Sequence, residues 1–342
     1  MTTLSDGDLA AVARVLADAG AAPVGPLSAT LIAGGRSNLT FRLDDGASRW
    51  VLRTPPRVGR TPSAHDVARE FRVTSALGAT AVPVARAVAL CEDESLIGGP
   101  FAVAEFVDGR TLQARDELEA LATGQVHAAV GALVETLATL HRVDHVAVGL
   151  GRFGRPDAYA ERQLKRWNGQ WEIVGSHLPD GVRRCASTLA ERLSAGLPEQ
   201  RSTGIVHGDY RIDNTLLDLS DGGARVAAVV DWELSTIGDP VADVAMMCVY
   251  RHPAFDLVIG SPTAWTSDLL PDPAALASAY EAAGGVPLVD WERHLALGYF
   301  KIAVIAAGID HRHRLGASQG EGFDTAGDSV GPFLDAGLQL LR

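Results

Sequence analysis

The sequence predicts an α+β protein of two lobes, in which a small lobe with an antiparallel sheet precedes a larger, mainly helical lobe. The chain has 342 residues, which exceeds the usual size of a single hydrophobic core. Short apolar runs separated by Gly and Pro fill the first part, and long Ala- and Leu-rich segments follow it. We therefore expect residues 1–104 to form the first lobe, 105–109 a hinge and 110–342 the second lobe.

The first lobe begins with a predicted amphipathic helix. Leu9, Val12 and Leu16 recur on one face, and Ser5 with Asp8 forms a variant of the capping box. The acidic residues of this segment stand where a signal peptide carries a basic region, so a signal peptide is not expected.

Strands are expected next. Residues 28–45 hold two apolar runs around a pair of glycines, and a third run at 48–56 ends in two prolines. Residues 65–79 have the apolar spacing of a helix, and the Pro- and Gly-punctuated stretch 81–109 predicts two further strands. The order strand, strand, strand, helix, strand, strand is typical of an α+β lobe.

The second lobe is predicted to be mainly helical. Helical spacing of apolar residues marks 131–144, 241–251, 273–285 and 291–313. Because the last of these is apolar on all sides, we expect it to be a buried core helix.

Composition limits the location and the partners. The net charge of −12 disfavours binding to nucleic acid, and the three cysteines show no metal-ligand spacing. No apolar run reaches the ~18 residues that a membrane helix needs. We expect a cytoplasmic protein that binds neither nucleic acid nor membranes, and its oligomeric state is unknown.

Two acidic motifs in the second lobe indicate chemistry. IVHGDYRIDN at 205–214 places Asp209 and Asn214 after one apolar run, and VAAVVDWE at 226–233 ends another run at Asp231. A buried carboxylate is unfavourable unless it is paired, so these runs predict a bound cation. The D-x-x-x-x-N spacing, followed by a strand that ends in Asp, is the pattern of the catalytic loop and metal-binding acid of protein kinases.

These residues meet the needs of phosphoryl transfer. We predict Asp209 to be the catalytic base that orients a hydroxyl acceptor, with Asn214 and Asp231 as oxygen ligands of Mg²⁺. The alternative is that all three only cap helices or form turns. Asp239 and Asp243, in GDPVADVA, are predicted to be structural acids that cap a helix or brace a loop.

The glycine pair lies between two predicted strands. Backbone N–H groups at Gly34 and Gly35 can approach a phosphate closely, and Ser37 and Asn38 can add side-chain donors. No helix follows, so this is not a Walker loop. Taken alone, the segment is better explained as an ordinary hairpin turn.

Arg53 ends a predicted strand, and Glu70 lies on the predicted helix that follows. A strand cation paired to a helix acid can clamp the phosphates of a nucleotide. The alternative is an exposed ion pair of little energetic value.

The motifs HGDYRIDN and VVDWE resemble those of the aminoglycoside phosphotransferase and choline-kinase-like family. Within that family, WVLRTPP, ERQLKRWNGQWE and HGDYRIDNTLLD with VVDWELSTIGDPVADVA are most similar to the kinase domain associated with acyl-CoA dehydrogenases. The resemblance implies a bilobal, protein-kinase-like fold and an ATP- and Mg²⁺-dependent transfer of the γ-phosphate to a small-molecule hydroxyl.

The resemblance also implies roles for residues of the first lobe. The glycine turn would cover the ATP phosphates, and the hinge AEFVDG, with Glu105 and Val107, would meet the adenine through its backbone. Most kinase-like lobes have Lys where this chain has Arg53. Because only Lys165 and Lys301 of the 30 cationic residues are lysine, we interpret the exchange as compositional.

The acceptor is less well defined by the sequence. Between the lobe boundary and the catalytic loop the chain gathers seven cationic residues: Arg152, Arg155, Arg162, Lys165, Arg166, Arg183 and Arg184. A local basic face would favour a phosphate-bearing acceptor such as a hydroxyacyl-CoA thioester over a polycation, although a solvated helix face explains the same residues. The alternative functions are an aminoglycoside or amino-alcohol phosphotransferase and a catalytically silent nucleotide-binding module.

Overall fold

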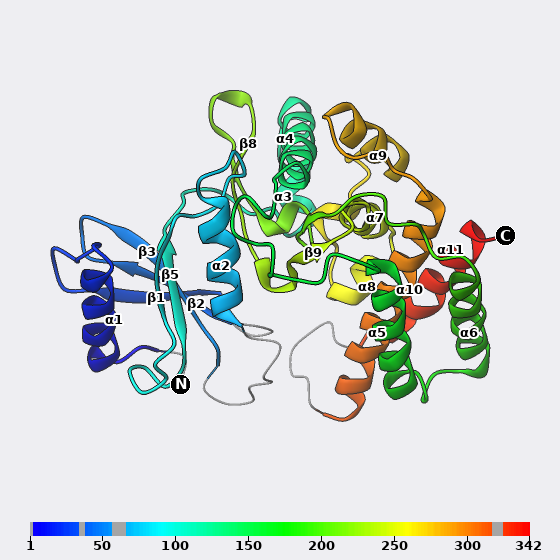
Figure 1. Ribbon diagram of the computed structural model, residues 1–342, viewed down its shortest axis with the longest axis horizontal. Coiled ribbons are helices and arrows are strands. Elements are labelled where there is room, and N and C mark those ends of the chain that lie inside the picture. Colours follow the sequence, from blue (N-terminus) through cyan, green and yellow to red (C-terminus); the bar gives the residue numbers. More distant parts are fainter. Residues whose placement is uncertain (1–2, 34–37, 57–65, 317–323) are drawn as a thin grey trace. The chain divides into compact units, whose positions relative to one another are not determined.

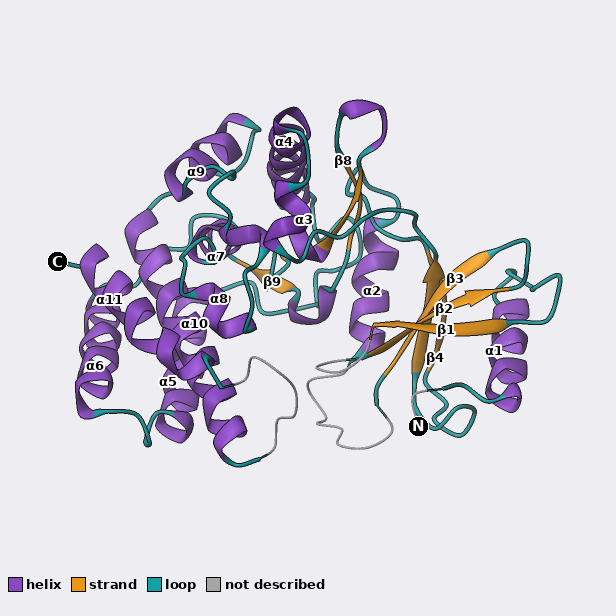
Figure 2. Cartoon of the chain, turned by 180° about the vertical axis from the view of Figure 1, so that it is seen from behind, coloured by secondary structure: helices purple, strands orange, loops and turns teal. Residues whose placement is uncertain are grey.

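The computed structural model describes residues 3–33, 38–56, 66–316 and 324–342, and it divides into two compact units (Figure 1). Unit 1 contains Met1–Gly109 and Ala227–Ser235, and unit 2 contains Arg110–Val226 and Thr236–Arg342. The strands gather in unit 1, whereas unit 2 is mainly helical (Figure 2). The predicted α+β class is confirmed. The assignment of nucleotide binding to the first lobe and of acceptor binding to the second remains a prediction.

Unit 1 is built on a five-stranded antiparallel sheet with the order β1-β2-β3-β5-β4. Its elements are α1 (Asp6–Asp18), β1 (Ser28–Ala33), β2 (Leu39–Asp44), β3 (Arg49–Thr54), α2 (Val67–Leu77), β4 (Ala87–Cys91) and β5 (Phe101–Glu105). They follow the predicted order, and the capping box of Ser5 and Asp8 begins α1 as expected.

The two helices of unit 1 cover opposite faces of the sheet (Figure 1). Val12 and Leu16 of α1 share a buried cluster with Trp50 and Leu52 of β3. Successive strand residues point to opposite faces, so Arg53 emerges on the face that α2 covers. Arg53 therefore lies on the face of the sheet that carries Glu70 of α2, opposite the hydrophobic cluster with α1.

Residues 227–235 belong to unit 1 although they follow the catalytic loop in sequence. The Val229 N–H donates to the Pro83 carbonyl at 2.8 Å, and the Arg69 guanidinium donates to the Ser235 carbonyl at 2.8 Å. The segment that carries Asp231 is therefore fixed to α2 and its neighbours by hydrogen bonds at both of its ends.

Unit 2 contains most of the helices, and α10 lies at its centre. The helices are α3 (Arg115–Glu119), α4 (Thr123–His141), α5 (Tyr159–Val174), α6 (Asp180–Ala195), α7 (Val241–Val249), α8 (Phe255–Ile259), α9 (Pro273–Ala282), α10 (Trp291–Arg314) and α11 (Val330–Leu340). Helix α10 packs against α5, α6, α7 and α11, and thirteen of its residues are buried. The prediction of a buried core helix is confirmed.

Short strands frame the catalytic loop of unit 2. The strands are β6 (Gly204–Val206), β7 (Thr215–Asp218) and β9 (Thr236–Gly238), while β8 (Arg225–Val229) begins here and continues into unit 1. Strands β6 and β9 pair in antiparallel register. Within the described residues, no helix has both the length and the apolar character needed to cross a bilayer.

Candidate active site

The loop between β6 and β7 holds the predicted catalytic pair. Gly208 has φ +89°, a conformation that glycine adopts without strain, and it turns the chain so that Asp209 follows the buried end of β6. The Asn214 amide donates to the Asp209 carboxylate at 2.9 Å and to its carbonyl at 2.7 Å. The structure therefore brings Asp209 and Asn214 together, and within the described chain no hydrogen bond occupies the amide oxygen of Asn214.

Asp209 is kept ionised by its surroundings. Burial favours the neutral acid, but the charge of Arg211 and the hydrogen bonds from Tyr250 and Arg211 outweigh this effect and hold the pKa of Asp209 well below its usual value. Arg211 lies 3.3 Å from the carboxylate, and its guanidinium stacks on the rings of Tyr250 and Phe255. A carboxylate this acidic is suited to orienting a hydroxyl more than to removing its proton early.

Asp243 stabilises the same loop through hydrogen bonds to its backbone. Its carboxylate accepts the backbone N–H groups of His207 at 2.6 Å and Gly208 at 2.7 Å, and its side chain is fully buried. His141 lies 3.2 Å from the same carboxylate. Asp239 accepts the N–H of Val241 near the start of α7, and burial raises the pKa of Asp239 to about 6. These contacts fit the structural roles expected for both acids.

The second group of predicted residues lies in unit 1. Arg53 Nη1 is 2.6 Å from Glu70 Oε2, and Arg53 Nη2 is 3.5 Å from Asp231 Oδ1. Asn38 is buried, and its amide donates to the other oxygen of Glu70 at 3.1 Å. Only 9% of the Glu70 side chain is exposed, so the alternative of a surface ion pair is wrong.

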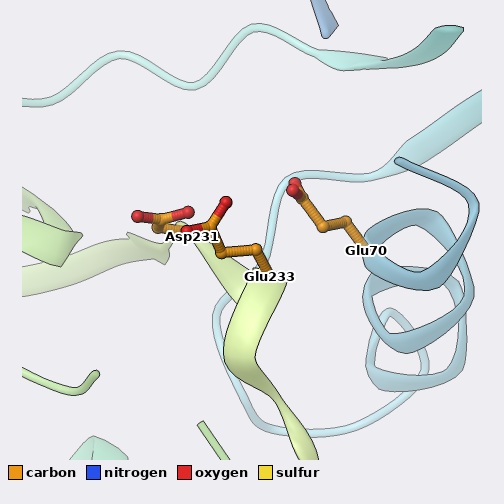
Figure 3. Close-up of side chains that lie close together, drawn as sticks. All are labelled: Glu70, Asp231 and Glu233. Carbon is orange, nitrogen blue, oxygen red and sulfur yellow. The ribbon is translucent and has the colours of Figure 1, made fainter. Parts of the chain in front are cut away.

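Asp231 stands in an unusual backbone conformation. Its φ is +64°, which is uncommon for a residue with a side chain, although Asp adopts it more readily than most residues do. The turn brings Glu233 close, and oxygens of Glu70, Asp231 and Glu233 lie within 4.8 Å of one another (Figure 3). Burial raises the pKa of Glu70 to about 7, because the charge of Arg53 compensates only in part and the charge of Asp231 opposes ionisation.

This carboxylate group fits Mg²⁺. Carboxylate oxygens are the hard ligands that Mg²⁺ prefers. Asp231 Oδ1 is buried and, within the described chain, accepts no hydrogen bond, so it retains ligand capacity. Asn214, the other predicted metal ligand, belongs to unit 2, so the joint role of Asn214 and Asp231 remains a prediction.

The remaining nucleotide-binding predictions have mixed outcomes. Gly34, Gly35 and Ser37 lie outside the described residues. Glu105 ends β5, donates its N–H to the Arg86 carbonyl and pairs its exposed side chain with Arg86. Val107 follows in the segment without regular structure that closes unit 1 at Gly109. Contact of these two backbones with adenine stays a prediction.

Three further side chains near the predicted site residues were not predicted from the sequence. Arg211 lies inside the catalytic motif, so its charge beside Asp209 was a usable signal. Glu233 lies two residues after Asp231, but its approach depends on the left-handed turn. Lys301 donates from α10 to the carbonyl of Gly208, a contact between residues 93 positions apart.

Solved structures and sequence relatives agree on the class of protein. A Ralstonia eutropha JMP134 protein, assigned provisionally as an aminoglycoside phosphotransferase, has a TM-score of 0.82 and 33% identity, with 97% of each chain covered. A thermostable mutant of aminoglycoside phosphotransferase APH(4)-Ia, in ternary complex with AMP-PNP and hygromycin B, has a TM-score of 0.60 and 17% identity, with 97% of this chain and 98% of that chain covered. The fold is therefore that of the protein-kinase-like phosphotransferases.

Residues 28–297 match the model of the phosphotransferase enzyme family, and the chain belongs to this family. A human relative, acyl-CoA dehydrogenase family member 11, is 34% identical over 90% of this chain. The chain spans only 39% of the length of that relative. The resemblances inferred from the sequence motifs are confirmed.

Proposed function

We propose that this protein transfers the γ-phosphate of ATP to a hydroxyl of a small molecule in a Mg²⁺-dependent reaction. The observation that carries the proposal is the pair of Asp209 and Asn214, held by Arg211 and braced by Asp243. Phosphoryl transfer has a loose transition state, so positioning and charge neutralisation supply most of the catalysis. A loop fixed by this many hydrogen bonds supplies positioning.

The proposed steps use residues of both units. Asp209 orients the acceptor hydroxyl and takes up its proton late in the transfer, since its pKa is low. Arg53, held by Glu70, is placed to align phosphate oxygens. Mg²⁺, held by Asn214 and Asp231, would neutralise charge on the phosphates. The AMP-PNP bound by the APH(4)-Ia structure supports a nucleotide as phosphate donor.

A catalytically silent module would keep the fold and lose turnover. A direct test measures ADP production by wild type and by Asp209→Asn with saturating Mg²⁺ and ATP, over a panel of hydroxylated small molecules. The proposal expects acceptor-dependent turnover in wild type that Asp209→Asn loses. If no acceptor raises ADP production although Mg²⁺-dependent ATP binding is intact, the silent module is the better description.

For the acceptor we favour a hydroxyacyl-CoA. The support is the similarity to a protein named as an acyl-CoA dehydrogenase family member, together with the resemblance in sequence motifs. An aminoglycoside is the second candidate, because the Ralstonia protein carries that provisional assignment. A competition assay with both acceptors decides between them, and preferential phosphorylation of the aminoglycoside would reject the hydroxyacyl-CoA.

A further inference from the structure

One cation of unit 2 takes no part in the chemistry described so far. Lys301 lies in the middle of α10, and its ammonium donates to the carbonyl of Gly208 at 3.1 Å. Gly208 directly precedes Asp209. The contact therefore places a positive charge beside the residue proposed to orient the acceptor hydroxyl.

The ammonium of Lys301 is only partly satisfied. An ammonium has three N–H donors, and within the described chain the Gly208 carbonyl is its one hydrogen-bond acceptor. No described carboxylate lies within ion-pair distance of it. The carboxylates of Asp243 and Asp209 have other partners, the loop N–H groups and Arg211. Burial lowers the pKa of Lys301, while the charges of Asp209 and Asp243 act in the opposite direction. A half-buried ammonium with free donors can accept an additional oxygen partner.

A small cavity lies in front of this ammonium. Residues of α10, α5 and α7 line it at helical spacing, among them Lys301, His294, Leu297, Tyr159, Trp167 and Met246. Its volume is about 20 Å³, which is room for one group of the size of an oxygen atom or a water molecule. Many of the lining side chains are apolar or aromatic, and Lys301 brings an ammonium group to the wall.

The wall has further polar groups, the side chains of Tyr159, Gln163, Trp167 and His294. The Trp167 indole N–H is already donated to Gln163 at 3.0 Å, and the Trp167 ring lies 5.9 Å from the ammonium. Burial lowers the pKa of His294 to about 4, so this side chain is neutral at physiological pH. Among the described residues that line the cavity, Lys301 is thus the sole charged group.

Lysine at position 301 is unusual for this chain, in which most cationic residues are arginine. The chain uses arginine for nearly all of its 30 cations, and the other lysine, Lys165, is exposed on α5. A compact ammonium can bind a backbone carbonyl and a ligand oxygen in a space where the planar guanidinium needs more room. The cavity of about 20 Å³ beside Gly208 offers such a space.

We propose that Lys301 binds a carbonyl or carboxylate oxygen of the acceptor, so that the acceptor is a hydroxy acid or a hydroxyacyl compound. This assignment rests on the proposed transfer to a hydroxyl oriented by Asp209. It defines the acceptor by two groups, a hydroxyl at Asp209 and an oxygen acceptor of hydrogen bonds at Lys301. A polyamine acceptor would place its own positive charges beside the ammonium and be repelled.

Binding is tested without any reference to turnover. Protein labelled with ¹³C at the lysine ε-carbon contains only two lysines, and Lys165→Arg assigns their signals. Hydroxyalkanoates that differ in the spacing between hydroxyl and carboxyl, and their coenzyme A thioesters, are titrated against alcohols of the same chain length. At least one carbonyl-bearing compound should move the Lys301 signal while the alcohols leave it in place. The proposal is overturned if no compound moves it, or if the alcohols move it equally.

Kinetics then separate acceptor binding from simple bracing of the loop. Lys301→Met should raise the KM for a hydroxy acid or hydroxyacyl acceptor by about tenfold to a hundredfold, with the KM for ATP unchanged. Lys301→Arg should recover part of the loss. An equal fall of kcat for all acceptors, with unchanged KM, would assign Lys301 to bracing and reject the proposal. If the NMR signal shifts but wild type transfers no phosphate, the transfer proposal fails while the binding assignment stands.

Discussion

The acidic groups of the candidate site differ in character between the two units. In unit 2 each loop carboxylate has its own partners, since Asp209 is held by Arg211 and Asn214, and Asp243 by two backbone N–H groups. In unit 1 the carboxylates of Glu70, Asp231 and Glu233 lie within 4.8 Å of one another, with Arg53 as the cation of the cluster.

This difference indicates which unit contains carboxylates whose negative charge is not yet compensated. A carboxylate with a depressed pKa, like Asp209, is already stabilised in its charged form. A carboxylate with its pKa raised to about 7, like Glu70, is not. We infer that unit 2 is preorganised for positioning, whereas unit 1 reaches electrostatic balance when it binds a further cation.

The largest effect is expected at Asp231. Asp231→Ala removes the oxygen that retains ligand capacity, so Mg²⁺-dependent binding of ATP should be lost, as measured by calorimetric titration with and without Mg²⁺. Glu92→Gln, at an exposed carboxylate of the same unit, is the matched control and should bind as wild type does. Unchanged Mg²⁺ dependence in Asp231→Ala would place the metal elsewhere and break the contrast between the units.

The next effect is expected at Asp209. Asp209→Asn keeps the shape of the side chain and can still meet the Asn214 amide, so fold and nucleotide affinity should persist. Turnover should fall by about 10²–10⁴-fold, the usual value of a positioned acid–base group. Steady-state kinetics with a saturating acceptor measure the loss, and thermal unfolding confirms that the variant is folded. Wild-type turnover would remove Asp209 from the mechanism.

The sequence was sufficient for contacts that lie within one local motif. Asp209 and Asn214 are five residues apart, and their hydrogen bond follows from the loop that joins two short strands. The pair of Arg53 and Glu70 was also predictable, because strand alternation and helical spacing decide which way each side chain points. The strands of the sheet and the long helices were predictable from the spacing of apolar residues along the sequence.

Tertiary packing determined what the sequence left open. Glu233 joins the cluster only because Asp231 adopts a left-handed conformation, which no residue type at that position requires. Lys301 reaches Gly208 through the packing of α10 against its neighbours. Composition had marked Lys301 as one of two lysines, but it could not indicate which carbonyl the lysine would bind.

A smaller effect is expected at Arg53. Arg53→Ala should raise the KM for ATP by about tenfold and lower kcat, because the phosphates lose an aligning charge and Glu70 loses its partner. Arg53→Lys keeps the charge and should retain most of the activity if the arginine reflects composition. Equal losses in both variants would show that the two-pronged guanidinium contact with Glu70 and Asp231 is itself required.

The smallest effect concerns the pH dependence of stability and tests the imbalance in unit 1 directly. The pKa of Glu70 is raised to about 7 from an ordinary value of 4.5, so between these pH values the folded protein holds a proton that the unfolded chain has released. The contribution of Glu70 to the free energy of unfolding should therefore be greatest at low pH and decline as the pH rises toward 7. Urea unfolding of wild type and Glu70→Gln measures this contribution as their difference across the interval. Mg²⁺ with ATP should shift the decline to lower pH, because a nearby cation favours the ionised acid. A difference between the two proteins that does not vary with pH would show that Glu70 is ionised throughout, and unit 1 would then be as well balanced as unit 2.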